Sequence, residues 1–363
     1  MKKNKNYVDL KDQPVPEGQH LLEVDDLKMY FHTEDGVVRA VDGVSYTLDR
    51  GETLGVVGES GSGKSVTAMT IMGLISMPPG KIEGGDVRYR GRSILEMTEE
   101  EMQHIRGNDI AMIFQDPMTS LNPVYKIGKQ VGEGLRLHRG YSKQEALKRA
   151  TELLDLVGIP EPEKRVNEYP HQFSGGMRQR VMIAMALACD PDILIADEPT
   201  TALDVTIQAQ IIELMQEMQE KNGNAIIMIT HDLGVVADMA DKIMVMYAGR
   251  PVEFGTAEEI FYESRHPYTW GLIRSIPEQA IEEKKPLTPI HGNPPSLMNL
   301  PEGCVFSPRC PYATDKCRKQ RPERVVTESG AYSACHYSGD PEFLKNAPET
   351  SRTRKDSKKG GEA

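Results

Sequence analysis

Short apolar runs alternate with helical patterns along the first two thirds of the chain. The apolar runs predict buried strands, and each is followed within a few residues by a glycine, a charged residue or a turn. Residues 141–158 carry apolar side chains at helical spacing and end at a glycine. Strands that alternate with helices are typical of an α/β domain on a largely parallel sheet. The predicted strands are residues 53–58, 110–114, 193–196 and 225–230.

The flanking segments have other patterns. Residues 21–50 alternate around a Glu-Asp-Gly turn, which predicts an antiparallel β layer. From about residue 277 prolines become frequent and helical periodicity disappears, so we expect a small module over 266–340. Residues 341–363 are charged and serine-rich, which predicts a disordered tail, and we expect residues 1–20 to be flexible. The main domain is then 21–265, with a helical subdomain at about 116–180.

Charge and hydropathy narrow the class of protein. The 363 residues include 43 Lys and Arg against 54 Asp and Glu, a net charge of −11, which disfavours binding to nucleic acid. The polar N-terminus lacks the apolar segment of a secretory signal. No run approaches the roughly 18 apolar residues of a membrane span. We therefore expect a cytoplasmic protein that does not itself cross a membrane.

A glycine-rich segment follows the first predicted strand. Gly58-Glu-Ser-Gly-Ser-Gly-Lys64-Ser65 fits the pattern G-x-x-x-x-G-K-[ST] of a phosphate-binding loop. Its glycines allow backbone N–H groups to surround phosphate, the lysine reaches the β and γ phosphates, and the serine hydroxyl binds Mg²⁺. The alternative is a chance glycine-rich turn. The residues expected to contact nucleotide are Ser60, Gly61, Ser62, Gly63, Lys64 and Ser65.

Two carboxylates follow the strand predicted at 193–196. Ligands bind at the carboxyl ends of strands in such sheets, so Asp197 and Glu198 are expected to face the phosphates. Asp197 would hold Mg²⁺ together with Ser65, and Glu198 would activate the attacking water as general base. A solvated turn is the alternative for two acids after a strand.

A third glycine-containing segment carries a resemblance. Tyr169-Pro-His-Gln-Phe-Ser174-Gly175-Gly176-Met-Arg-Gln-Arg resembles the Leu-Ser-Gly-Gly-Gln signature of ATP-binding cassette (ABC) proteins, with Phe173 and Met177 as departures. Other motifs of that family occur in order, and together they span about residues 21–260. They are the Q-loop glutamine Gln115, the D-loop aspartate Asp204 and the switch histidine His231.

The resemblance implies a fold and a set of roles. Two cassettes would pair head to tail, so that Ser174, Gly175 and Gly176 face the γ-phosphate on the partner's loop. Gln115 would sense Mg²⁺ and link the site to a membrane partner, while His231 would contact the γ-phosphate. Asp204 would communicate between the two sites. The alternative for His231 is a histidine with a purely structural hydrogen bond.

Adenine requires a flat partner. By its position ahead of the phosphate-binding loop, Phe31 matches the family's adenine-stacking aromatic. The neighbouring Tyr30 competes for that role, and simple core packing of Phe31 is the other alternative.

Four of the five cysteines lie close together in the chain, at Cys304, Cys310, Cys317 and Cys335. In a reducing compartment such a group favours a metal centre over disulfides, although the spacing lacks the C-x₂-C of structural zinc. The segment, preceded by His266-Pro-Tyr-Thr, resembles the C-terminal extension of oligopeptide and dipeptide ABC importer ATPases. That resemblance implies a [4Fe–4S] cluster. Zinc and uncoordinated thiols remain alternatives, with His336 as a substitute ligand.

The resemblance implies an ATP-hydrolysing subunit of a di- or oligopeptide importer at the cytoplasmic face of the cell membrane. Its expected partners are a paralogous ATPase, two transmembrane permeases and an extracytoplasmic peptide-binding protein, and a homodimer is the alternative to the paralogous pair. Import of nickel or another metal chelate is a second candidate function. A soluble ABC ATPase acting on ribosomes or DNA is a third, and a P-loop GTPase or kinase a fourth.

Overall fold

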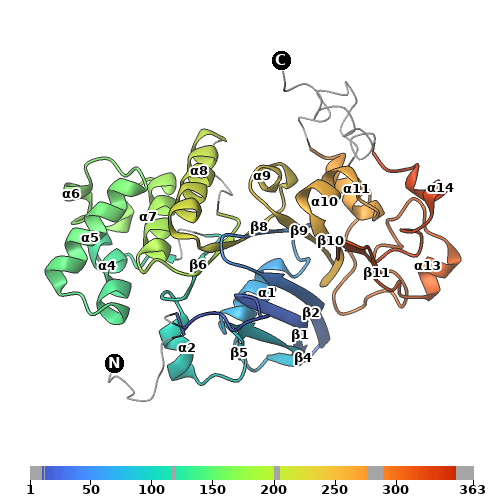
Figure 1. Cartoon of the computed structure of the whole chain (residues 1–363), viewed down its shortest axis with the longest axis horizontal. Coiled ribbons are helices and arrows are strands. Elements are labelled where there is room, and N and C mark those ends of the chain that lie inside the picture. Colours follow the sequence, from blue (N-terminus) through green and yellow to red (C-terminus); the bar gives the residue numbers. More distant parts are fainter. Residues whose placement is uncertain (1–9, 12, 117–119, 200–204, 277–288, 349–363) are drawn as a thin grey trace.

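The computed structural model of the chain describes residues 10–11, 13–116, 120–199, 205–276 and 289–348. Figure 1 shows strands at its centre, a helical group at residues 127–187 on one side and the C-terminal segment on the other.

The larger sheet carries the predicted strands. Its five neighbouring strands from β9 to β6 run parallel, while β10 pairs antiparallel with β9. All four predicted strands are confirmed. They could be recognised because strands covered on both faces read as continuous apolar runs. Within the described residues the spatial order is β11 (Val325–Val326), β12 (Tyr332–Ser333), β10 (Arg250–Thr256), β9 (Lys242–Tyr247), β3 (Thr53–Val57), β8 (Ala225–Thr230), β7 (Ile193–Asp197) and β6 (Ile110–Ile113).

The predicted antiparallel layer is a separate, smaller sheet. Strands β1 (Leu22–Thr33) and β2 (Gly36–Leu48) pair from Leu22↔Leu48 to Thr33↔Gly36 across the predicted turn. β4 (Gly80–Tyr89) and β5 (Arg92–Ser93) complete the order β2-β1-β4-β5. These last two strands are not predicted, because β4 is interrupted by glycines and charges.

The helical group includes α5 (Lys143–Leu156), the helix predicted from periodicity. A capping box formed by Ser142 and Glu145 fixes where α5 begins. Its neighbours are α4 (Ile127–His138), α6 (Pro162–Arg165), the 3₁₀ turn η1 (Pro170–Gln172) and α7 (Gly175–Leu187). The group therefore ends at Leu187 rather than near residue 180.

The remaining helices lie along the rest of the chain. The helix after the phosphate-binding loop begins at its lysine. The described helices outside the helical group are α1 (Lys64–Ile71), α2 (Glu99–Ile105), α8 (Val205–Asn222), α9 (Leu233–Ala237), α10 (Ala257–Tyr262), α11 (Pro267–Ile273), α13 (Asp315–Lys319) and α14 (Pro341–Leu344).

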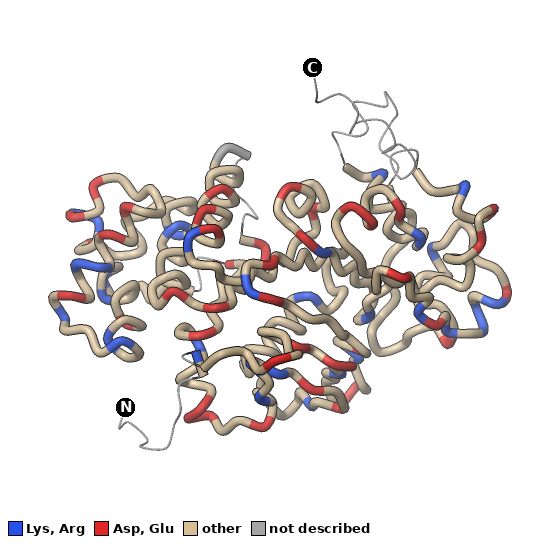
Figure 2. The backbone as a smooth tube through the Cα atoms, in the orientation of Figure 1, with Lys and Arg blue, Asp and Glu red and all other residues tan. Residues whose placement is uncertain are grey.

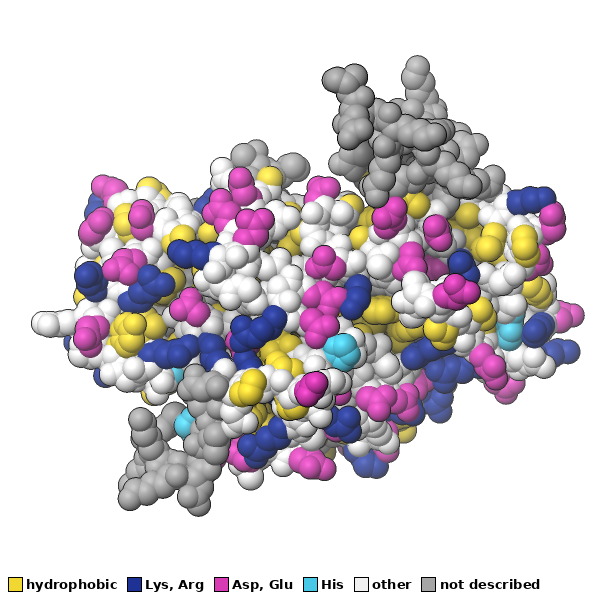
Figure 3. Space-filling model, in the orientation of Figure 1, with side chains coloured by type: hydrophobic (Ala, Val, Ile, Leu, Met, Phe, Trp, Pro, Cys, Tyr) yellow, Lys and Arg dark blue, Asp and Glu magenta, His cyan; other side chains and the backbone are white. Residues whose placement is uncertain are grey.

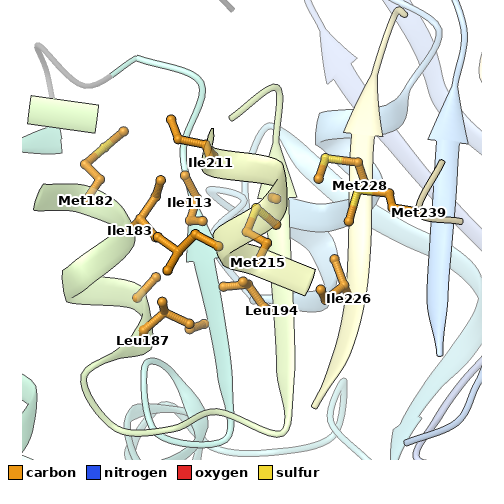
Figure 4. Close-up of a cluster of buried hydrophobic side chains, with 14 of the residues drawn as sticks. Ile113, Met182, Ile183, Leu187, Leu194, Ile211, Met215, Ile226, Met228 and Met239 are labelled. Atoms are coloured by element: carbon orange, nitrogen blue, oxygen red, sulfur yellow. The ribbon is translucent and has the colours of Figure 1, made fainter. Parts of the chain in front are cut away.

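Buried aliphatic and methionine side chains join the larger sheet to its helices (Figure 4). Strand residues meet residues of α7 and α8 in one continuous core. Labelled members of this core are Ile113, Met182, Ile183, Leu187, Leu194, Ile211, Met215, Ile226, Met228 and Met239.

Described residues within both expected loose segments are more ordered than predicted. Leu10 is only 5% exposed and packs into the core of the antiparallel sheet, so the prediction of a flexible segment over 1–20 is wrong there. At the other end, α14 forms where the disordered tail was expected to begin. Phe343 of α14 lies 5.4 Å from Trp270, between ring centroids. Apolar contacts of Leu10 and Phe343 hold these two described segments against the folded chain.

The cysteine-bearing segment packs onto the main domain. Strands β11 and β12 extend the larger sheet through β10. Phe306 is buried and contacts Tyr247 of β9 and Tyr268 of α11, with ring centroids 5.2 and 5.3 Å apart. The segment therefore shares the core of the main domain.

Charged side chains of both signs are interspersed along the chain (Figure 2) and over the face shown in Figure 3. Within the described ranges, none of the helices has the length and apolar character needed to cross a membrane.

Candidate ATP-binding site

The phosphate-binding loop leaves β3 and enters α1. Gly58 and Gly63 have φ values of +155° and +99°. A Cβ at Gly58 would lie 2.2 Å from the Met246 carbonyl oxygen, and one at Gly63 would lie 2.3 Å from that of Ala40. Only glycine fits at these two positions, so the neighbouring strands impose the shape of the loop.

Exposure varies along the loop. Ser60 and Gly61 are exposed, whereas Ser62 and Gly63 are buried. Among the described residues the buried Ser62 hydroxyl finds no hydrogen-bond partner. The exposed part of the loop is open to a ligand, and the buried part contacts the protein.

Lys64 is drawn back along the loop. Its side chain is 5% exposed, and its Nζ donates to the carbonyl oxygens of Gly58 (2.6 Å) and Glu59 (3.1 Å). Burial lowers the pKa of the Lys64 amino group, while the charges of Glu198 and Asp197 oppose that shift. An ammonium bonded to two neutral carbonyls within its own loop is suited to exchange them for phosphate oxygens.

Ser65 and Asp197 lie together, as predicted. The Ser65 hydroxyl donates to the Asp197 carboxylate over 2.9 Å. Asp197 ends β7, is 2% exposed, and has a pKa raised by burial and further by Glu198. A hydroxyl and a carboxylate supply hard oxygen ligands, so this pair fits Mg²⁺.

Glu198 lies at the meeting point of two other predicted residues. Gln115 donates from Nε2 to the Glu198 carboxylate over 2.9 Å. His231 Nδ1 lies 3.3 Å from the same carboxylate. Glu198 itself has a φ of +48°, in the left-handed region. The ends of β6, β7 and β8 thus bring an amide, a carboxylate and an imidazole into one cluster.

The signature residues lie elsewhere. Ser174 caps α7 and accepts a hydrogen bond from the backbone of Met177, while Gly175 and Gly176 form the first turn. α7 packs against β6, α4 and α5 in the helical group. A Cβ on Gly175 would meet nothing within 4 Å, so this turn is open. Asp204 lies outside the described residues.

The two aromatic candidates differ in their surroundings. Phe31 is half-buried at the edge of the core of the antiparallel sheet. The Tyr30 hydroxyl donates to Asp42 over 3.0 Å. Tyr30 is thus engaged with a carboxylate, and Phe31 offers the less polar surface.

The four C-terminal thiols lie close enough to affect one another. Burial, and then the neighbouring cysteines, raise the pKa of Cys310 to about 11 and of Cys335 to about 12. Cys304 donates its backbone N–H to the Cys317 carbonyl over 2.8 Å. In the part of the chain that the structure describes, however, no three His, Cys, Asp or Glu side chains are arranged to hold one metal ion. The thiols form a group, and neither predicted metal is confirmed.

Sequence patterns miss three residues at the loop. Glu59, inside the phosphate-binding loop, is bonded by Arg309 and Tyr268 from the C-terminal part of the chain. The only signal is a charged residue among serines and glycines, and it does not identify distant partners.

Comparisons with known proteins agree with this geometry. A family model described as "ABC transporter" matches residues 41–201, and one described as "Oligopeptide/dipeptide transporter, C-terminal region" matches residues 252–317. The oligopeptide transport ATP-binding protein OppD of Bacillus subtilis is 59% identical over 302 residues, which is 83% of this chain and 84% of that protein. The dipeptide transport ATP-binding protein DppD of Escherichia coli is 52% identical over 320 residues, covering 88% of this chain and 97% of that protein.

A solved structure shares the fold. The ATP-binding cassette MJ0796, a dimer in a post-hydrolysis state bound to ADP and Pi, is 29% identical and has a TM-score of 0.59. The similarity covers 65% of this chain and 98% of that cassette. The predicted cassette fold and the predicted family are both confirmed. The chain belongs to the ATP-binding subunits of oligopeptide and dipeptide ABC transporters.

Proposed function

We propose that the chain binds Mg²⁺–ATP at Ser60–Ser65, hydrolyses it with Glu198 as general base, and powers import of di- or oligopeptides through separate permeases. The observation that carries this proposal is the cluster that joins α1 to the ends of three parallel strands. In it, Ser65 reaches Asp197, and Gln115 and His231 reach Glu198.

Each residue has a distinct part in hydrolysis. Loop N–H groups and Lys64 bind the β and γ phosphates, and Phe31 stacks on adenine. Ser65, Asp197 and Gln115 would hold Mg²⁺, which would supply positive charge to the phosphates. Glu198 takes a proton from water as the water oxygen attacks the γ-phosphorus, and the bond between that phosphorus and the ADP oxygen breaks. His231 orients Glu198 and contacts the γ-phosphate.

A single chain provides only part of this site. Ser174, Gly175 and Gly176 begin α7, which packs within the helical group. An open helix N-terminus with two glycines is suited to bind phosphate on another molecule. We therefore include a second cassette, a paralogous ATPase, whose loop faces Ser174, and Asp204 as the contact between the two sites.

An apolar groove gives a place for the permease. It has a volume of about 590 Å³ and lies between the end of α1, β6 and α7. Phe114, beside Gln115, lines it and is partly exposed. A short apolar helix of a permease would fit there, and its movement would reach Glu198 through Gln115. We propose that the chain works at the cytoplasmic face of the cell membrane, with a peptide-binding protein on the opposite side.

The cysteine group is proposed to hold a [4Fe–4S] cluster. Support comes from the family resemblance and from four mutually interacting thiols. Cys304, Cys310, Cys317 and Cys335 would each supply one thiolate to such a cluster. Anaerobically purified chain should contain iron and absorb visible light, and replacing Cys304 by serine should remove both. Zinc without colour, or no metal and four reactive thiols, would contradict the cluster.

ATP binding is tested with the purified full chain. We expect Lys64→Ala to abolish measurable ATP binding and Ser65→Ala to remove its Mg²⁺ dependence. Lys148→Ala, on the exposed face of α5, is the matched control and should bind as the wild type does. Unchanged binding in Lys64→Ala would exclude the loop as the ATP site.

Substrate and partners are tested in cells. The chain should co-purify from detergent-solubilised membranes with two permeases and a second ATPase. Uptake of labelled di- or oligopeptides should require an intact Glu198. Nickel uptake without peptide uptake would exclude peptide import.

A further inference from the structure

The phosphate-binding loop carries an acidic side chain that none of the roles above uses. Glu59 directly follows Gly58, and its side chain is 30% exposed. Its carbonyl oxygen accepts one of the two hydrogen bonds from Lys64. A carboxylate at this place would repel phosphate unless its charge were compensated.

Arg309 supplies that compensation from the C-terminal segment. Its two terminal nitrogens donate to the two oxygens of Glu59, over 2.5 and 2.9 Å. This is the bidentate geometry of a strong charge-assisted pair. The Arg309 side chain is only 4% exposed, so the pair is shielded from solvent on the arginine side.

All five N–H donors of Arg309 are engaged. Two bonds go to Glu59, and the others reach the Tyr247 hydroxyl (3.3 Å) and the carbonyl oxygens of Ile290 (3.1 Å) and His291 (2.9 Å). The guanidinium therefore has one orientation, and it faces the loop. Lysine could not reproduce this set of bonds.

Tyr268 holds the backbone of the same residue. Its hydroxyl accepts the Glu59 N–H over 2.9 Å. Tyr268 is fully buried, and its ring packs on Tyr247 and Phe306 with centroids 4.6 and 5.3 Å away. Phe306 in turn accepts the backbone N–H of Arg309 through its carbonyl oxygen. One aromatic cluster thus fixes both groups that hold Glu59.

We propose that Arg309 and Tyr268 are positioning residues for ATP binding: Arg309 neutralises the charge of Glu59 beside the phosphates, and Tyr268 fixes the backbone N–H of the same residue. The C-terminal segment is by this account a working part of the nucleotide site. The inference rests on the proposed function, because it takes the loop to be the site of ATP binding.

The test is equilibrium ATP binding by the full-length chain. Arg309→Gln should weaken binding on the order of tenfold, because it leaves an uncompensated carboxylate beside the phosphates. Arg309→Lys should have an ATP affinity between those of the wild type and of Arg309→Gln. Tyr268→Phe should weaken binding by about threefold, since it removes one neutral acceptor. The control is Arg318→Gln, which alters an exposed arginine of the same segment paired with Asp315, and it should bind normally.

A second substitution separates electrostatic positioning from general stability. Glu59→Gln in the Arg309→Gln background should restore ATP affinity to within about threefold of the wild type, because the unpaired charge is gone. Glu59→Gln alone should bind ATP at least as tightly as the wild type. Thermal unfolding without nucleotide, measured on every variant, identifies any that do not fold.

The possible results distinguish failure of the inference about Arg309 from failure of the proposed function. Wild-type affinity in folded Arg309→Gln would overturn the inference. A double variant as weak as Arg309→Gln would also overturn it, because the role would then be merely structural. Failure of the wild-type chain to bind ATP, with Lys64→Ala indistinguishable from it, would instead overturn the proposed function.

Discussion

Gln115 donates a hydrogen bond to the carboxylate of Glu198, joining residues 83 positions apart at the ends of β6 and β7. Together with His231 on its other oxygen, this bond fixes the orientation of Glu198. The carboxylate can still accept a proton, which is what a general base requires.

Glu198→Gln should therefore retain ATP binding and lose hydrolysis on the order of 100–10,000-fold, because the shape of the side chain is kept and the proposed base is lost. Binding and turnover are measured on the same assembled transporter. Glu152→Gln, an exposed change on α5, should leave both unchanged. Near-normal turnover in Glu198→Gln would remove this residue from the role of base.

A buried ion pair ties the antiparallel sheet to the start of β7. Arg90 lies 2.5 Å from Asp192, both side chains are at most 5% exposed, and the Tyr89 hydroxyl also donates to Asp192. Asp192→Ala should lower the free energy of unfolding by about 3–5 kcal/mol, because it leaves a buried guanidinium without its main partner. Urea unfolding followed by circular dichroism measures this.

The exposed pair of Lys345 and Glu342 gives the comparison. Glu342→Ala should change stability by less than about 1 kcal/mol. Equal effects of the two substitutions would show that burial of the Arg90–Asp192 pair does not matter.

Glu253 should make stability depend on pH. It is 3% exposed in β10, and burial raises its pKa to about 7 from an ordinary value of 4.5. Its contribution is fully present below pH 4.5 and is lost as pH rises to about 7, because over that range the unfolded chain releases the proton while the folded chain keeps it. Glu253→Gln, which cannot ionise, should gain about 3 kcal/mol on the wild type across that range. A difference that does not change with pH would contradict this.

Lys11 should stabilise the link between the N-terminal segment and α7. Its Nζ donates to the carbonyl oxygen of Asn108 (3.1 Å). It also donates to those of Cys189 (3.0 Å) and Asp190, which lie just beyond the end of α7. Lys11→Met keeps the apolar stem and removes the donors. We expect a loss of about 1–3 kcal/mol in unfolding free energy. Lys143→Met, at the exposed start of α5, should cost little, and equal effects would argue against the link.

Local sequence patterns predicted the central strands and the loop correctly. β3 and β8 are continuous apolar runs, and the loop pattern defines its own strand-to-helix turn. The same reasoning placed Asp197 beside Ser65, since strand ends share one edge of the sheet.

Features that depend on distant residues could not be predicted. The hydrogen bonds that join Glu59 to Tyr268 and to Arg309 span 209 and 250 positions and leave no periodic signal in the sequence. Leu10 lies in a mostly polar segment, and its neighbours Val8 and Val15 form no periodic pattern with it, so nothing marks it as buried. Ser174 caps α7 in the helical group, and the partner cassette proposed for it lies outside this chain.

The position of Arg309 bears on where an independent ATP-binding unit ends. The match to the ABC transporter family covers residues 41–201, and every motif of the loop and its acids lies within it. A chain shortened to residue 265 would keep all of these motifs but would lose both partners of Glu59. The smallest piece with a complete phosphate-binding loop is therefore longer than the smallest piece with complete motifs, and it extends at least to Arg309.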